Sequence, residues 1–131
     1  MKMENDMRRI LIVDDDSMNL KVAKVILESN GYKTITAISA AECFETLKEE
    51  MVDLVLLDIE MPIMNGIKTL EYMRSHEKFK EIPVMFLTAD ADIETVKEAA
   101  RLGAKGYVKK PFLPHDLLER VGQVIQEKIE D

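Results

Sequence analysis

Three apolar runs of strand character in this chain lead directly into charged residues. The junctions fall at Val13-Asp14, Leu57-Asp58 and Val108-Lys109. Burying carboxylates or ammonium groups inside a strand without partners would cost several kcal/mol each, so these charges belong at the strand ends. In an open α/β sheet, the crevice that binds ligands lies outside the carboxyl ends of the strands. Acids that face a lysine across such a crevice predict a site for a divalent cation and a phosphate.

Strand-like and helix-like segments alternate along the whole chain. The expected strands are Arg9–Val13, Tyr32–Ile38, Leu54–Leu57, Val84–Leu87 and Gly106–Lys109. The expected helices run from Ser17 to Asn30-Gly31, from Ser39 onward, from the loop Met61–Gly66 to about Ser75, from Asp92 to Leu102, and from Pro114 to about Lys128. Five successive strand–helix units imply an α/β fold, with a doubly wound five-stranded parallel sheet and helices on both faces.

Local signals describe some of these elements in more detail. Ser39-Ala40-Ala41-Glu42 has the pattern of a capping box, in which Ser and Glu satisfy opposing backbone amides. Leu54–Leu57 is uninterrupted and apolar, as expected for a central parallel strand that is covered on both faces. Apolar residues at helical spacing are Val22, Val25 and Ile26 in the first helix and Cys43, Phe44 and Leu47 in the second.

Composition narrows the class of protein further. The chain has 131 residues, enough for one domain, and a net charge of −7 without a basic stripe, which argues against direct nucleic-acid binding. Its longest apolar runs are far shorter than the roughly 20 residues of a membrane helix, so no membrane association is expected. The single cysteine, Cys43, excludes an internal disulfide and fits a reducing cytoplasm, the expected location.

Four motifs then identify a family resemblance. They are ILIVDDD at residues 10–16, LVLLDIEMPIMNG at 54–66, FLTADAD at 86–92 and GYVKKPF at 106–112. In this order and spacing, they resemble the response-regulator receiver domain of two-component signalling. The resemblance implies a flavodoxin-like sheet with strand order 2-1-3-4-5. We expect a flexible N-terminus over residues 1–7, a receiver domain over 8–128 and a C-terminal tail over 129–131.

The acids are expected to combine a phosphoacceptor with a metal site. Asp58 ends the central strand in the middle of the crevice, and carboxylates act as phosphoryl nucleophiles. Mg²⁺ prefers octahedral oxygen coordination by one or two carboxylates together with phosphate oxygens and water. The resemblance implies that Asp15, Asp58 and the backbone carbonyl of Glu60 bind Mg²⁺ directly and that Asp14 acts through a coordinated water. Asp16 is expected to cap the following helix instead.

The catalytic set is completed from the last two strands. The resemblance implies that Lys110 reaches the acids and then the phosphoryl oxygens, whereas Lys109 points away because side chains alternate along a strand. It also implies that Lys110–Pro111 is a candidate cis bond. Thr88, at the end of the fourth strand, is expected to donate a hydrogen bond to a phosphoryl oxygen.

The resemblance also predicts how phosphorylation would be transmitted. Thr88 and Lys110 would be drawn toward the new phosphoryl group, and Tyr107 would rotate into the space vacated. The output face would consist of the fourth helix, the fifth strand and the fifth helix. Glu60 and Asp90, two residues beyond Asp58 and Thr88, are expected to tune the lifetime of the acyl phosphate.

The expected function is therefore that of a phosphoacceptor signalling domain. It is no enzyme in the ordinary sense, although it assists its own phosphorylation and dephosphorylation. The expected partners are a histidine kinase or histidine phosphotransferase, as phosphoryl donor, and a downstream effector protein. The chain is expected to be a monomer or a phosphorylation-dependent dimer. Two interpretations stay open for four apolar residues beside the crevice: they form a surface that docks the donor, or some of them belong to the core. They are Met61, Ile63, Met64 and Phe112.

Three alternatives stay open from the sequence. A haloacid-dehalogenase-like aspartyl phosphatase also uses a strand-end aspartate and Mg²⁺, but it needs Asp-x-Asp where this chain has Asp58-Ile59-Glu60. A flavodoxin-like flavin binder shares the topology, yet no phosphate-cradling loop rich in Gly, Ser and Thr is present. A receiver domain that belongs to a multidomain transcription factor or hybrid kinase is the third possibility.

Overall fold

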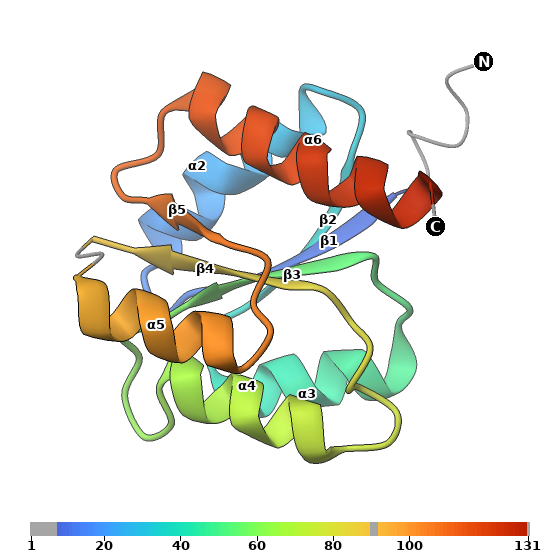
Figure 1. Ribbon diagram of the computed structural model, residues 1–131. Coiled ribbons are helices and arrows are strands. Elements are labelled where there is room, and N and C mark those ends of the chain that lie inside the picture. Colours follow the sequence, from blue (N-terminus) through green and yellow to red (C-terminus); the bar gives the residue numbers. More distant parts are fainter. Residues whose placement is uncertain (1–7, 90–91, 131) are drawn as a thin grey trace.

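The computed structural model of the chain describes residues 8–89 and 92–130 (Figure 1). The strands are β1 (Arg9–Val13), β2 (Lys33–Ala37), β3 (Leu54–Asp58), β4 (Val84–Thr88) and β5 (Tyr107–Lys109). The helices are α2 (Ser17–Glu28), α3 (Ala40–Glu49), α4 (Gly66–Ser75), α5 (Ile93–Arg101) and α6 (Pro114–Glu130). Asp90 and the expected flexible N-terminus lie outside the described residues. Within the described part, no helix is both long enough and apolar enough to cross a membrane.

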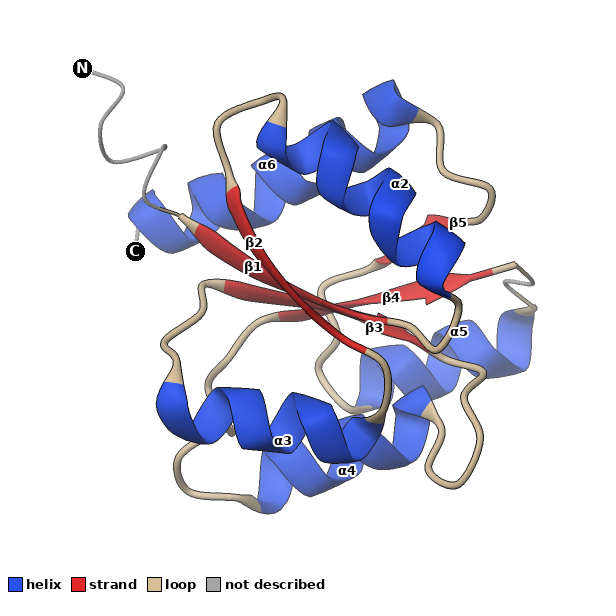
Figure 2. Cartoon of the chain, turned by 180° about the vertical axis from the view of Figure 1, so that it is seen from behind, coloured by secondary structure: helices blue, strands red, loops and turns tan. Residues whose placement is uncertain are grey.

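The strands form one parallel sheet in the order β2-β1-β3-β4-β5. Helices α2 and α6 cover one face, and α3, α4 and α5 cover the other (Figures 1 and 2). The expected doubly wound fold and its strand order are therefore confirmed. Because β3 lies at the centre with its neighbours parallel to it, the carboxyl ends of these strands meet at one edge of the sheet.

Two hydrophobic cores lie on the two faces of the sheet. Alternate residues of β1 enter different cores: Ile10 and Ile12 belong to the core under α2 and α6, whereas Leu11 and Val13 belong to the other. All five residues of β3 are buried. A strand covered on both faces has no solvent-facing side that polar residues could occupy, which explains the unbroken apolar runs.

Helix α2 differs from the expectation in the face that it buries. Its buried residues are Leu20, Ala23 and Leu27. Of the expected residues, Ile26 is half-buried against the same core, whereas Val22 and Val25 are exposed. Both sets have helical spacing, so periodicity alone could not choose between them. The small Ala23 side chain allows the helix to approach the sheet closely, and this contact exists only once the sheet has formed.

Helix α3 begins at the expected capping box, with one change of partner. Ser39 Oγ accepts a hydrogen bond from the amide of Glu42 at 3.1 Å, as expected. The Glu42 carboxylate accepts from the amide of Ile38 at 2.9 Å, one residue before the N-cap. Because Ser39 is extended (φ −160°, ψ 167°), the chain before the helix brings the Ile38 amide within reach of Glu42. Cys43 and Leu47 are buried, as expected.

Gly66 is the first residue of α4 and not the end of the preceding loop. Asn65 caps the helix by accepting from the Lys68 amide at 2.9 Å, and the Gly66 amide donates to the Ile59 carbonyl at 2.7 Å. A Cβ atom at Gly66 would collide with the carbonyl oxygen of Asp58. The glycine thus lets the start of α4 pack directly against the strand end that carries Asp58.

Arg74 ties three segments of the chain together. Its Nε donates to the Leu102 carbonyl at 3.0 Å, where α5 ends, and its guanidinium also donates to the Ile82 carbonyl at 3.0 Å, just before β4. Burial is the main cause that lowers the pKa of Arg74 from its ordinary value. No sequence pattern marks this residue, because its partners are carbonyl groups 8 and 28 residues away.

Candidate functional site

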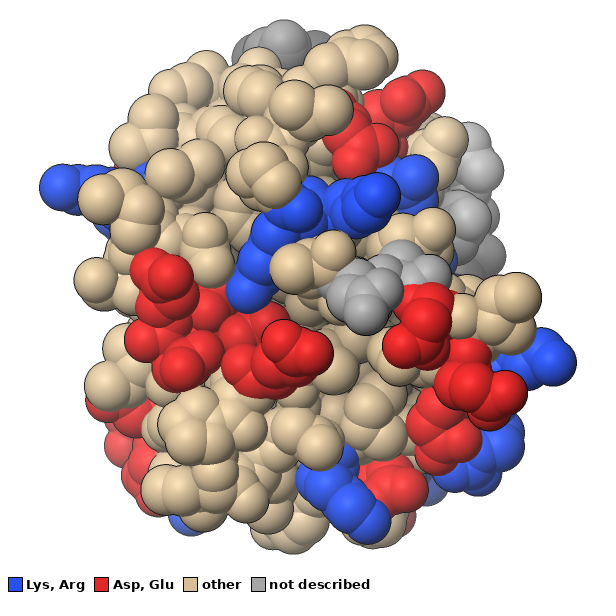
Figure 3. Space-filling model, turned by 90° about the vertical axis from the view of Figure 1, so that its left-hand side faces the viewer, with Lys and Arg blue, Asp and Glu red and all other residues tan. Residues whose placement is uncertain are grey.

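The polar residues singled out in the sequence gather at the carboxyl edge of the sheet. Asp14 follows β1, Asp58 ends β3, Thr88 ends β4 and Lys110 follows β5. The parallel strands are in register across this edge, with Val13 paired to Leu57 and Asp58 paired to Leu87. Figure 3 shows acidic side chains gathered beside basic ones on this side of the molecule. The topology therefore brings together four groups that lie up to 96 residues apart in sequence.

Lys110 forms the centre of the site. Its Nζ lies 2.8 Å from Asp14 Oδ2 and 2.9 Å from Asp58 Oδ1, to which it donates a hydrogen bond. Asp14 and Asp58 are only 1% and 3% exposed. The backbone amide of Lys110 donates to the Thr88 carbonyl at 2.9 Å, which fixes the start of the segment after β5. Lys109 is exposed, as side-chain alternation predicts, and the Lys110–Pro111 bond is cis.

The buried carboxylates at this site outnumber the ammonium group that they contact. Burial raises the pKa of Asp58 to about 7 from an ordinary 3.8; the hydrogen bond from Lys110 opposes the rise, and the charge of Asp14 adds to it. Burial disfavours the charged form of Lys110, but its contacts with Asp14 and Asp58 outweigh this and raise the pKa of the ammonium. Two buried carboxylates thus face one ammonium, which leaves the site short of one positive charge.

Three carboxylates are arranged so that they can hold a cation. Oxygen atoms of Asp14, Asp15 and Asp58 lie within 4.8 Å of one another. Asp14 Oδ1 accepts from the Asp16 amide at 2.9 Å, whereas the buried Oδ2 accepts no well-aligned hydrogen bond from the described residues. Its contact with Lys110 is an ion pair without that alignment. A cluster of three carboxylates with a single ammonium partner is an all-oxygen set that fits a hard divalent cation such as Mg²⁺.

Two neighbouring acids lie outside this cluster. Asp16 accepts hydrogen bonds from the Met18 and Asn19 amides at 2.8 and 3.3 Å, so it caps α2 as expected. Glu60 is exposed in the loop after β3, and its carboxylate is not part of the group of three. Asp90 falls on a residue that the structure does not describe.

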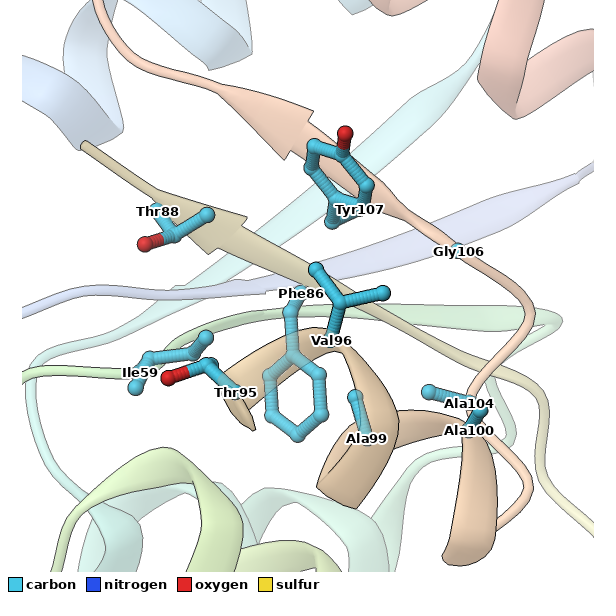
Figure 4. A pocket seen from close by; sticks show the side chains of 10 residues that line it. All are labelled: Ile59, Phe86, Thr88, Thr95, Val96, Ala99, Ala100, Ala104, Gly106 and Tyr107. Carbon is cyan, nitrogen blue, oxygen red and sulfur yellow. The ribbon is translucent and has the colours of Figure 1, made fainter. Parts of the chain in front are cut away.

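Thr88 and Tyr107 border a cavity beside the carboxylates. Thr88 is buried at 4% exposure, and Tyr107 is half-buried. The guanidinium carbon of Arg120 lies 5.4 Å from the centre of the Tyr107 ring, and Arg120 Nε is held by Asp116 Oδ1 at 2.9 Å. The ring also borders a cavity of about 160 Å³ (Figure 4). The Asp116–Arg120 pair is visible as an i,i+4 pattern in the sequence, but its position over Tyr107 is not.

The apolar residues expected to form a docking surface differ in exposure. Met61 and Phe112 are buried at 8% and 9% exposure and belong to the two cores, so they are not surface residues. Ile63 is fully exposed and has φ 71°, a left-handed backbone that is rare for a β-branched residue. Met64 is half-buried. Ile63 is therefore the member of the expected set that projects from the loop beside Asp58.

Comparisons with known proteins agree with this geometry. A model of the response regulator receiver domain family matches residues 10–122. The chain is 36% identical over 123 residues to the chemotaxis protein CheY-3 of Vibrio cholerae, over 93% of this chain and 95% of that protein. It is 42% identical over 104 residues to the regulatory protein AtoC of Escherichia coli, over 79% of this chain and 22% of AtoC.

A solved structure shows the same arrangement of strands and helices. The CheY-like response regulator receiver domain protein of Methanospirillum hungatei is similar with a TM-score of 0.86. Its sequence is 34% identical, and the match covers 95% of this chain and 98% of that one.

Proposed function

This chain belongs to the response regulator receiver domain family, and on that premise we propose that Asp58 accepts a phosphoryl group from a phosphohistidine of a partner protein. The family is one of signalling domains, and the haloacid-dehalogenase-like alternative is not favoured by this membership. The observation that carries the proposal is the buried Asp58 carboxylate, held 2.9 Å from Lys110 within a cluster of three acids. Asp14 is also buried beside Lys110, but it follows β1, whereas Asp58 ends the central strand β3.

Phosphoryl transfer would proceed by attack of an Asp58 carboxylate oxygen on phosphorus. The new O–P bond forms as the donor's P–N bond breaks, and the imidazole of the donor keeps the bonding electrons. Such transfer depends on in-line positioning and on neutralising the negative charge of the equatorial oxygens. The Lys110 ammonium, whose pKa is raised, remains charged at neutral pH and is placed to follow the phosphoryl oxygens. The Thr88 hydroxyl would donate a hydrogen bond to one of them.

A divalent cation fits the acid cluster. Mg²⁺ would be bound directly by Asp15, Asp58 and the backbone carbonyl of Glu60. Asp14 would bind it through a water molecule. When bound, Mg²⁺ neutralises part of the charge on the carboxylates and on the incoming phosphoryl group. Without such a cation, the raised pKa of Asp58 keeps part of the nucleophile protonated near neutral pH.

The proposed switch connects Asp58 to the surface formed by α5, β5 and α6. A phosphoryl group adds about two negative charges and three acceptor oxygens, which compete for Lys110 and Thr88. Tyr107 would then turn from the Arg120 side into the neighbouring cavity of about 160 Å³. Aromatic contact with a cation is worth about 0.5–1 kcal/mol at an exposed site, so Arg120 biases the ring without locking it.

The remaining parts of the proposal concern partners and lifetime. The donor would be a histidine kinase or histidine phosphotransferase that contacts the loop carrying Ile63, and the phosphorylated face would bind a downstream effector protein. Glu60 and Asp90 would tune how long the acyl phosphate survives. We propose a cytoplasmic protein, a monomer or a phosphorylation-dependent dimer, that binds neither nucleic acid nor membrane directly.

Labelling with acetyl phosphate and Mg²⁺ tests this proposal, with intact-mass spectrometry as the readout. We expect the wild type to gain one phosphoryl group and Asp58→Asn to gain none. Asp16→Asn is the matched control, because asparagine caps a helix as well as aspartate does, and it should be labelled normally. An unlabelled wild type, or normal labelling of Asp58→Asn, would contradict the proposal.

A further inference from the structure

The cavity beneath Tyr107 lies between α5 and the end of the sheet. Its volume is about 160 Å³. Phe86 from β4, Tyr107 from β5 and Val96 from α5 supply its larger walls (Figure 4). Ile59, Thr88 and Thr95 border it as well, and the space exists because four further lining residues are small: Ala99, Ala100, Ala104 and Gly106. A larger side chain in place of Ala99 or Ala100 would fill the cavity.

The walls define the chemistry of a suitable occupant. They consist mainly of hydrocarbon, and the hydroxyls of Thr88 and Thr95 lie toward one end (Figure 4). Among the residues that the structure describes, no charged side chain borders the space. A charged ligand would therefore lose its hydration without gaining a partner. An engineered apolar cavity of about 150 Å³ in another protein binds benzene. An uncharged ring of about six atoms thus matches both the volume and the lining.

Two elements border this space: strand β5, which carries Tyr107, and helix α5. The Tyr107 hydroxyl points away from Phe86 and Ala99 (Figure 4), and the Arg120 guanidinium lies 5.4 Å from the ring centre. Ala99 is the one fully buried residue of α5, and Thr95 and Val96 are half-buried beside it. Arg74 holds the far end of the same helix through the Leu102 carbonyl. The cavity thus lies between helix α5 and Tyr107, the proposed switch residue.

We propose that this cavity is a binding site for a small uncharged aromatic molecule, and that its occupancy opposes phosphorylation of Asp58. The second half rests on the proposed function, because it requires Tyr107 to enter the same space after phosphorylation. Two events that compete for one space are coupled reciprocally: each lowers the affinity for the other by the same factor. A bound ring would hold the unphosphorylated arrangement of Thr88 and Tyr107.

Benzene is the probe for the site itself, in protein without acetyl phosphate. We expect binding with a dissociation constant on the order of 1 mM, seen as ¹H–¹⁵N shifts of residues around the cavity. At about 5 mM benzene the melting temperature should rise by about 3 °C. Ala99→Leu should abolish both effects, as should Ala100→Leu, the more exposed position if the first variant folds poorly. Ala41→Leu, on the exposed face of α3, is the matched control and should bind normally.

The proposed binding site would be refuted if benzene did not bind to the wild type, or if it bound equally well to both cavity-filling variants. The coupling is measured separately by repeating the titration with acetyl phosphate and Mg²⁺ present. We expect at least a 10-fold loss of benzene affinity in the phosphorylated protein. Unchanged affinity in a protein shown to be phosphorylated would overturn the coupling and leave the site standing. A wild type that binds benzene but is never phosphorylated would refute the proposed function instead, and the coupling with it.

Discussion

Replacing Asp58 by asparagine is expected to stabilise the metal-free protein, although it removes the proposed phosphoacceptor. Burial raises the pKa of this carboxyl to about 7, against an ordinary 3.8. A group whose pKa is raised by folding contributes stability that is fully present below its unfolded pKa, near pH 4. That contribution is lost as the pH rises through about 7. Above this pH, the buried Asp58 carboxylate is ionised next to Asp14, and both carboxylates share Lys110 as their partner.

The size of the effect follows from the pKa difference. Each pKa unit corresponds to about 1.4 kcal/mol. A pKa of about 7 in place of 3.8 therefore amounts to roughly 4 kcal/mol of lost stability at pH 8. Asparagine resembles the protonated carboxyl, but it offers Lys110 a weaker acceptor, which reduces the gain. We expect the free energy of unfolding to be roughly 2–4 kcal/mol higher for Asp58→Asn, which corresponds to about 10 °C in melting temperature.

The assay is urea denaturation in EDTA, followed by circular dichroism from pH 4.5 to 8. The advantage of Asp58→Asn should grow with pH across this range. Asp16→Asn should stay within about 0.5 kcal/mol of the wild type at every pH, since its side chain caps an exposed helix start. Added Mg²⁺ should stabilise the wild type more than Asp58→Asn, because a ligand stabilises the state that binds it. Equal stability of Asp58→Asn and wild type at pH 8, or a difference that does not change with pH, would refute the reasoning.

Four further predictions concern single residues. Lys110→Ala should slow phosphorylation by acetyl phosphate about 100-fold, whereas the exposed Lys109→Ala should leave the rate unchanged; equal rates would remove Lys110 from the site. Gly66→Ala should lower the free energy of unfolding by roughly 2 kcal/mol or more, because its Cβ meets the backbone at the end of β3. Gly122→Ala, whose Cβ meets nothing within 4 Å in helix α6, should raise it by about 0.5–1 kcal/mol; urea titrations of both variants check the opposite signs. Burial raises the pKa of the Cys43 thiol to about 12, so the folded protein should resist iodoacetamide at pH 8 and react only when urea unfolds it.

Much of the fold was predictable because each strand carries its own signal. The runs Ile10–Val13 and Leu54–Leu57 are apolar throughout, and that pattern is stable only in strands covered on both faces. Helix starts were predictable where a cap is local, as at Asp16 and Ser39. The buried face of α2 was not predictable, since two stripes share one period and only contact with the sheet selects Ala23.

The sequence predicted which residues form the candidate site, but not which of them are buried or which contact one another. Asp14 and Asp15 follow the same run, and nothing in their order says which is buried. The structure buries Asp14 because Lys110 arrives beside it from β5, and it leaves Asp15 exposed. The contact between Arg120 and the Tyr107 ring likewise depends on how α6 packs against β5, since the two residues lie 13 positions apart in sequence.

The sequence by itself determined the alternation of strands and helices, the strand-end positions of Asp58, Thr88 and Lys110, and the local helix caps. These depend on the character of neighbouring residues, which the chain order contains directly. Only the tertiary structure decided the pairing of Lys110 with two buried carboxylates, the raised pKa of Asp58 and the cavity beside Tyr107. Each of these depends on burial and on distances between segments far apart in the chain, and such distances exist only after the sheet and its covering helices have packed.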